Sequence, residues 1–233
     1  MQLDAIRNRA RADLILTTEH GEEDVVLWEH AVRVAENARR IARLPEVRAA
    51  SPDDVALTAA ALYHDAGWAA RHRNEEIRRE EVLVCPRTDS QREEAAIILE
   101  RRLADLLPPE SIERAAATVR VLHQRDVQLI EAEIVTEADT LDEFGVLSLW
   151  LTMRRGVVSG KGVQYVIDTW ERRRQFRYWD ALLDGAFRYA SVRAVAETRL
   201  QQLEAFMEQL IAQHCGEDLE RALDAEGVSP GGR

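Results

Sequence analysis

The stretch "ALYHDAGW", Ala61–Trp68, decides the fold of this chain. The segment from Val55 to His64 consists mostly of apolar residues and good helix formers, so it is predicted to be a helix that packs in a core. That helix ends on His64 and Asp65, and Gly67 follows two positions later. An imidazole and a carboxylate are costly to bury unless they have partners. The sequence therefore raises the question of which partner these two side chains share.

The bulk composition excludes several classes of protein. The chain has 233 residues, of which 46% are hydrophobic and 31% are charged, as in an ordinary globular protein. A net charge of −11 argues against nucleic acid as a partner. Cys85 and Cys215 show no ligand-like spacing, which indicates a reducing compartment. No apolar run is long enough to span a membrane, so we expect a cytoplasmic protein without a membrane partner.

Helical periodicity along most of the chain predicts an all-α fold. The predicted helices cover residues 24–44, 51–64, 91–106, 110–124, 131–143, 145–155, 163–174 and 188–214. Ser51 is the predicted N-cap of the second helix, with Pro52 at its first position. Residues 66–90 are charged and irregular, so we interpret them as a long loop with at most one turn of helix.

The same pattern suggests three regions. We expect residues 1–155 to form one helical domain. Residues 156–222 are predicted to be a C-terminal helical extension packed on the same core. Residues 223–233, which are rich in glycine, are predicted to be a disordered tail.

Four predicted helices each direct an imidazole or a carboxylate towards a buried face. His30 lies at the edge of an apolar stripe, His123 ends its helix, and Asp139 follows Val135 by four positions. Asp142 is an alternative to Asp139, because the spacing permits either to face inward. A shared divalent metal ion explains why so many polar groups point inward, since nitrogen and oxygen donors together suit such ions.

The surrounding motifs resemble a known family. "WEHAVRVAENARRIA", "AALYHDAGW", "VLHQRD" and "EADTLDEFG" occur in the order found in the HD-domain superfamily of metal-dependent phosphohydrolases, and the resemblance covers about residues 24–155. It implies an HD-domain helical bundle with His30, His64, Asp65 and Asp139 as metal ligands. It also implies hydrolysis of a phosphomonoester or nucleotide through a metal-activated water. The implied cofactor is a divalent ion: Mn, Co, Ni, Fe or Mg.

One departure from the family pattern concerns the number of metal ions. Binuclear members carry a further histidine after the His-Asp pair, whereas "SQREEAA" places Gln91, Arg92 or Glu94 there. We therefore expect one ion. A di-iron oxygenase is the alternative, and it would need additional ligands such as His72 and His123. A catalytically silent module that binds a metal or a nucleotide is a third possibility.

Other residues are candidates for contact with the substrate. We assign Asp65, His123 and Arg33 catalytic roles, and Arg33, Arg92 and His123 contacts with a small phosphorylated substrate, because guanidinium groups bind phosphate oxygens well. The simpler interpretation of His123 is a histidine that stabilises a helix C-terminus. The two arginines are equally compatible with solvated surface positions, and the chain is compatible with a homo-oligomer.

Overall fold

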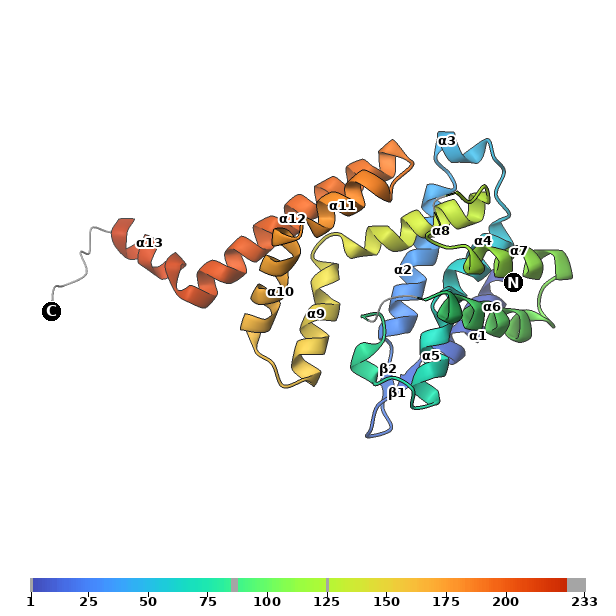
Figure 1. Cartoon of the computed structure of the whole chain (residues 1–233), viewed down its shortest axis with the longest axis horizontal. Helices are drawn as coiled ribbons and strands as arrows, with labels where there is room; N and C mark the ends of the chain where they lie inside the picture. The colour runs from blue at the N-terminus through green and yellow to red at the C-terminus, as the bar shows by residue number, and fades with distance from the viewer. Residues whose placement is uncertain (1, 85–87, 125, 226–233) are drawn as a thin grey trace. The chain divides into compact units, whose positions relative to one another are not determined.

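The computed structural model describes residues 2–84, 88–124 and 126–225. The chain divides into two compact units. The first unit comprises Met1–Glu143 and Ala186–Val192, and the second comprises Phe144–Gly185 and Arg193–Arg233. Figure 1 shows that helices dominate both units, which confirms the predicted all-α fold.

The first unit is a bundle built around α4. Its elements are α1 (Gln2–Leu14), β1 (Leu16–Thr17), β2 (Glu23–Asp24), α2 (Val26–Ile41), α3 (Pro45–Arg48), α4 (Asp54–Tyr63), α5 (Ala66–Arg73), a 3-10 turn (Arg79–Glu81), α6 (Asp89–Leu103), α7 (Pro109–Arg120), α8 (Ile130–Thr140) and a second 3-10 turn (Leu141–Glu143). Helix α4 packs against α1, α2, α6, α7 and α8, and all its residues from Ala56 to Tyr63 are buried. The two short strands pair antiparallel, with Leu16 opposite Asp24.

The second unit consists of helices. They are α9 (Leu147–Val158), α10 (Val163–Gln175), α11 (Tyr178–Gly185), α12 (Ala190–Cys215), whose first turn belongs to the first unit, and α13 (Glu217–Ala225). The rings of Trp170 and Trp179 are both buried, with centroids 4.8 Å apart, and they join α10 to α11. Within the described residues, no helix is both long and apolar enough to cross a membrane.

The start of α4 differs from the sequence prediction. Ser51 was the predicted N-cap, but the cap is Asp53, whose carboxylate accepts hydrogen bonds from the backbone N–H groups of Val55 and Ala56 at 2.8 and 3.0 Å. Ser51 instead has a φ of 49° in the preceding loop. A carboxylate that satisfies two free amides is a strong helix start, so the helix begins two residues later than predicted.

The predicted loop over residues 66–90 was wrong at its beginning. Residues Ala66–Arg73 form the two-turn helix α5, and its first four residues are buried. Gly67 allows α5 to approach α6 closely, because a Cβ atom there would lie 2.6 Å from the backbone oxygen of Gln91. The last turn of this short helix is charged, so the apolar residues are confined to its first turn. They are too few to give a helical periodicity in the sequence.

The compact units divide the chain at other positions than the sequence-based regions. The boundary that we expect between residues 155 and 156 falls inside α9. The first unit instead consists of two separate stretches of the chain, one that ends at Glu143 and a second that covers residues 186–192. In the predicted tail, residues 223–225 form the end of α13, and residues 226–233 lie outside the described residues. The packing of the C-terminal extension on the core stays a prediction.

A buried carboxylate holds residues 186–192 within the first unit. Oε1 of Glu137 on α8 accepts hydrogen bonds from the backbone N–H groups of Arg188 and Tyr189, at 2.6 and 3.2 Å. Glu133, one turn earlier, accepts a hydrogen bond from the Tyr189 hydroxyl at 3.2 Å and pairs with Arg188. Burial raises the pKa of Glu137 to about 7, although the two backbone hydrogen bonds oppose this shift.

This raised pKa predicts a pH-dependent contribution to stability. The folded state binds the Glu137 proton more tightly than the unfolded state, so the stabilisation is complete below the unfolded pKa of about 4.5 and is lost as the pH rises through 7. In Glu137→Gln, the free energy of unfolding should lack this decline between pH 4.5 and 7. Denaturant titrations of both proteins across that range measure the difference. An identical pH dependence in the two proteins would contradict the assignment.

Candidate metal centre

Three helical regions of the first unit bring four donor side chains together. His30 comes from α2, His64 and Asp65 lie at the junction of α4 and α5, and Asp139 comes from the last turn of α8. Their relative exposures are 4%, 2%, 1% and 1%, so all four are buried. Because α4 is surrounded by other helices, its C-terminal end delivers the His-Asp pair into the interior.

The donor atoms converge on one region. Nε2 of His30 lies 3.3 Å from Nε2 of His64, 3.5 Å from Oδ2 of Asp65 and 3.3 Å from Oδ1 of Asp139. Nε2 of His64 lies 3.4 Å from the same oxygen of Asp65 and 3.6 Å from the same oxygen of Asp139. Donors bound to one ion at about 2.0–2.2 Å lie roughly 3–3.5 Å apart. The observed separations are compatible with a metal site, and the donor atoms of His30, His64 and Asp65 all lie within 4.8 Å of one another.

Hydrogen bonds on the opposite ring nitrogens orient both imidazoles. Nδ1 of His30 lies 2.9 Å from Oδ2 of Asp142, and Nδ1 of His64 lies 2.8 Å from the backbone oxygen of Ala61. Because both partners are acceptors, each Nδ1 carries the proton and donates it. With a divalent ion in place of any proton on Nε2, each Nε2 would present a lone pair to the common region, which is the arrangement that metal ligation requires.

The electrostatics of the cluster also suit a cation. Burial lowers the pKa of His30, but contacts with Asp139, Asp142 and Asp65 outweigh it, so the pKa lies well above its usual value. Three carboxylates around one imidazole thus stabilise positive charge in the interior. A divalent ion would satisfy the same demand, with His30, His64, Asp65 and Asp139 as the residues that hold it.

Asp142 and Arg33 lie behind His30, on the side of its ring away from the other donors. The sequence predicted Asp142 as an alternative metal ligand and Arg33 as a substrate contact. Asp142, the alternative ligand, contacts the far nitrogen of His30, and its carboxylate also accepts hydrogen bonds from Nε and Nη2 of Arg33 at 3.1 and 2.9 Å. Burial raises the pKa of Asp142, but His30 and Arg33 reverse this effect and lower it to about 2. The Asp142 carboxylate therefore stays ionised behind His30, and Arg33 is engaged with it.

Gln91 is one of the three residues that the "SQREEAA" motif places where binuclear members of the family would carry a histidine. Its side chain is fully buried, and Nε2 donates a hydrogen bond to Oδ1 of Asp65 at 3.3 Å. The second oxygen of Asp65 is thus in contact with an amide donor. His72, the other candidate for a second site, has its ring nitrogens 3.4 Å from the backbone oxygens of Ile77 and Thr17. These contacts attach His72 to the loop after α5 and to β1.

The remaining predicted site residues have different surroundings. Nε2 of His123 lies 2.9 Å from Oδ2 of Asp139, and its side chain is 29% exposed, so it lies between a candidate ligand and solvent. His123 also has a φ of 64°, and its backbone N–H donates to Oγ1 of Thr136. Arg92 pairs with Asp89 on its own helix, and no described contact joins it to the four donors.

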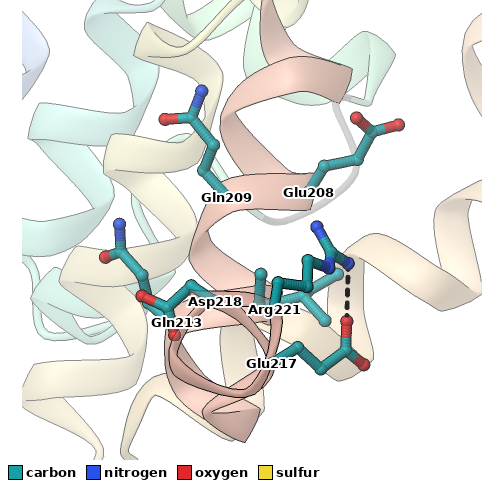
Figure 2. Close-up of a pocket in the computed structure, with 8 residues that line it drawn as sticks. Glu208, Gln209, Gln213, Glu217, Asp218 and Arg221 are labelled. Carbon is teal, nitrogen blue, oxygen red and sulfur yellow. Dashed lines mark hydrogen bonds and ion pairs between the residues drawn. The ribbon is translucent and has the colours of Figure 1, made fainter. Parts of the chain in front are cut away.

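The second unit contains a pocket of different character. It has a volume of about 450 Å³ and lies between α12 and α13. Figure 2 shows polar side chains around it, including Glu208, Glu217 and Asp218, and an ion pair between Arg221 and Glu217 at 3.0 Å. All these side chains are exposed, and carboxylates on an exposed surface are adequately solvated without a ligand.

Comparison with solved structures shows the same fold in three bacterial proteins. The chain is similar to Bacillus subtilis YpgQ, solved in complex with ADP, with 20% identity, a TM-score of 0.56, and coverage of 90% of this chain and 93% of that one. A predicted HD-superfamily hydrolase from an uncultured Thermotogales bacterium gives 19% identity, a TM-score of 0.55, and coverage of 91% and 92%. An HD-superfamily hydrolase from Bacillus thuringiensis gives 16%, 0.58, and coverage of 91% and 95%.

Comparison with sequence families settles the relationship. No curated protein matches the chain. The sequence model of the HD domain matches residues 27–143, which is half of the chain and contains all four donors. The resemblance noted from the motifs is therefore confirmed, and the chain belongs to the HD domain family.

Proposed function

We propose that this protein is a divalent-metal-dependent phosphohydrolase that acts on a phosphomonoester or nucleotide. The observation that carries this proposal is the convergence of the four donors: the Nε2 atoms of the two imidazoles lie 3.3 Å apart, and each lies 3.3–3.6 Å from one oxygen of Asp65 and one oxygen of Asp139. A bound divalent ion supplies Lewis acidity, which polarises a phosphoryl oxygen and acidifies water at neutral pH.

Two of the proposed ligands are held through their second oxygens. Gln91 donates a hydrogen bond to Oδ1 of Asp65, so Oδ2 keeps its direction towards the imidazoles. His123 holds Oδ2 of Asp139 in the same way. In the proposed reaction Asp65 orients the attacking water or accepts its proton, and the part-exposed His123 gives a proton to the leaving oxygen.

The proposed substrate class follows from the chemistry and from one relative. Bacillus subtilis YpgQ binds ADP in its crystal structure, and the same fold here supports a phosphorylated small molecule as the ligand. Arg33 is proposed to contact the phosphoryl group. Its side chain is 33% exposed, and the N–H groups that do not bind Asp142 are the proposed donors. For Arg92 a substrate contact stays a prediction.

A substrate screen tests the proposal. Purified protein is incubated with nucleoside mono-, di- and triphosphates and with sugar phosphates, each with Mn, Co, Ni or Mg, and released phosphate is measured. Turnover of at least one class, with loss of turnover in chelator, is the expected result. Tight metal binding without phosphate release from any compound would favour the catalytically silent module.

The metal count is a separate prediction. Protein reconstituted with excess iron or manganese and then desalted should hold about one ion per chain, because Gln91 occupies the second oxygen of Asp65. Elemental analysis measures the ratio. The matched variant His72→Ala should leave the ratio unchanged. A ratio near two that falls in His72→Ala or His123→Ala would instead favour the di-iron oxygenase.

A further inference from the structure

Three arginines line a pocket at the other end of α2. The pocket has a volume of about 330 Å³, and Arg39, Arg43 and Arg48 line it together with Ser51 and Asp54. Arg39 lies nine residues after His30 on the same helix, which is about 14 Å along the helix axis. The pocket therefore lies apart from the candidate metal centre.

These arginines differ from most others in the first unit. Arg40, adjacent to Arg39, pairs with Glu36 one turn earlier, and Arg33 and Arg114 pair with buried carboxylates. Among the residues described for this unit, the arginines that make no hydrogen bond or ion pair are the three in the pocket and Arg101. Unpaired arginines are thus concentrated in one place.

The local charge is unfavourable without a further partner. Arg39 lies at the end of α2 and Arg43 in the turn that follows it, and both line the same pocket, where like charges repel. Asp54 is the acidic residue that lines the pocket with them, so the lining carries a net charge of about +2. The whole chain carries −11, and its charge balance therefore does not account for a local excess of positive charge.

Stabilisation of a helix end explains only part of this pattern. Arg39 lies in the last turn of α2 and Arg43 follows it, where positive charge interacts favourably with the helix dipole. Arg48 belongs to α3, which has four residues and therefore a small dipole. A shared anionic ligand accounts for all three positions, because planar guanidinium groups match the oxygens of a phosphate group.

We propose that this pocket is a second binding site, specific for a small anion that carries phosphate groups. The inference goes beyond the proposed hydrolysis, because it needs neither the metal nor turnover. The volume suits a group of the size of pyrophosphate or the phosphate chain of a nucleotide. The Ser51 side chain at the pocket adds a hydroxyl donor to the three guanidinium groups.

Calorimetric titration with inorganic pyrophosphate tests this site. The full chain is used at physiological ionic strength with EDTA present, so that no divalent ion can hold pyrophosphate at the metal centre. We expect one saturable site per chain, and affinity reduced by about tenfold or more in the double variant Arg43→Gln/Arg48→Gln, since each lost charged hydrogen bond is costly. Both arginines are exposed, and circular dichroism verifies that the variant is folded.

Two controls make the outcome decisive. Arg101→Gln removes an exposed, unpaired arginine outside the pocket, and Asp65→Ala alters the metal centre; both should bind pyrophosphate as the native chain does. Absence of saturable binding, an equal loss in Arg101→Gln, or unchanged affinity in the double variant would each overturn the proposal. The metal-dependent screen is unaffected by any of these results, so the two proposals fail independently.

Discussion

Asp65→Ala is expected to abolish tight metal binding and every phosphatase activity that the native chain shows. The side chain is buried, with Oδ2 lying 3.5 and 3.4 Å from the two imidazole nitrogens, and its other oxygen is held by Gln91. Its removal leaves three donors and takes one negative charge from the cluster. Elemental analysis after desalting and phosphate release from the substrates found in the screen measure the two losses.

The fold should survive this substitution. Asp65 is the N-cap residue of α5 but makes no side-chain capping hydrogen bond there, so the helical circular dichroism should change little. Asp168→Ala is a matched control, because this carboxylate is exposed on α10 in the second unit; it should retain both metal and activity. Native activity in Asp65→Ala would refute the role assigned to the His-Asp pair.

The second large effect is expected from Asp142→Asn. The substitution keeps the size of the side chain but removes the charge that faces Nδ1 of His30 and the guanidinium group of Arg33. Partners of this kind orient metal-binding histidines, and their loss typically weakens metal affinity about 10- to 100-fold. Competition titration with a chromophoric chelator measures the dissociation constant.

A comparison of two variants shows whether Asp142 acts on metal affinity by orienting the His30 ring or only through its charge. Arg33→Gln removes a charge from the same cluster but leaves the contact between Asp142 and His30, so it should weaken metal binding less than Asp142→Asn. Asp142→Asn with native metal affinity would show that the packing of α2 alone orients His30. Equal losses in the two variants would show that the intact Arg33–Asp142 ion pair, and not the Asp142–His30 contact alone, orients His30.

The four proposed ligands could be identified from the sequence because each is tied to a helical stripe. His30 follows Leu27, and Asp139 follows Val135, so the direction of both side chains is fixed once the helices form. The spacing left Asp139 and Asp142 as alternatives. The structure uses both, since they approach opposite nitrogens of the His30 ring. An acid three residues after a candidate ligand is therefore a usable signal for such a pair.

Other features depend on contacts between distant segments. The hydrogen bond from Gln91 to Asp65 requires α5 and α6 to approach at Gly67, and no periodicity within either segment reports that distance. The same holds for α5 itself, whose first turn is buried by tertiary packing although its last turn is charged. Hydrophobic periodicity within each segment predicted the helices of the core. Which polar side chains contact one another depends on tertiary packing, which that periodicity does not report.

The return of residues 186–192 to the first unit makes this folding unit discontinuous in sequence. A fragment cut after Glu143 would retain every candidate ligand, yet it would lack the two amides that bind Glu137, two positions before Asp139 on α8. Such a fragment would expose a carboxylate and its apolar surroundings next to the metal centre. We therefore expect the smallest piece that folds on its own to extend beyond the family match. The segment Phe144–Gly185 connects two parts of the first compact unit.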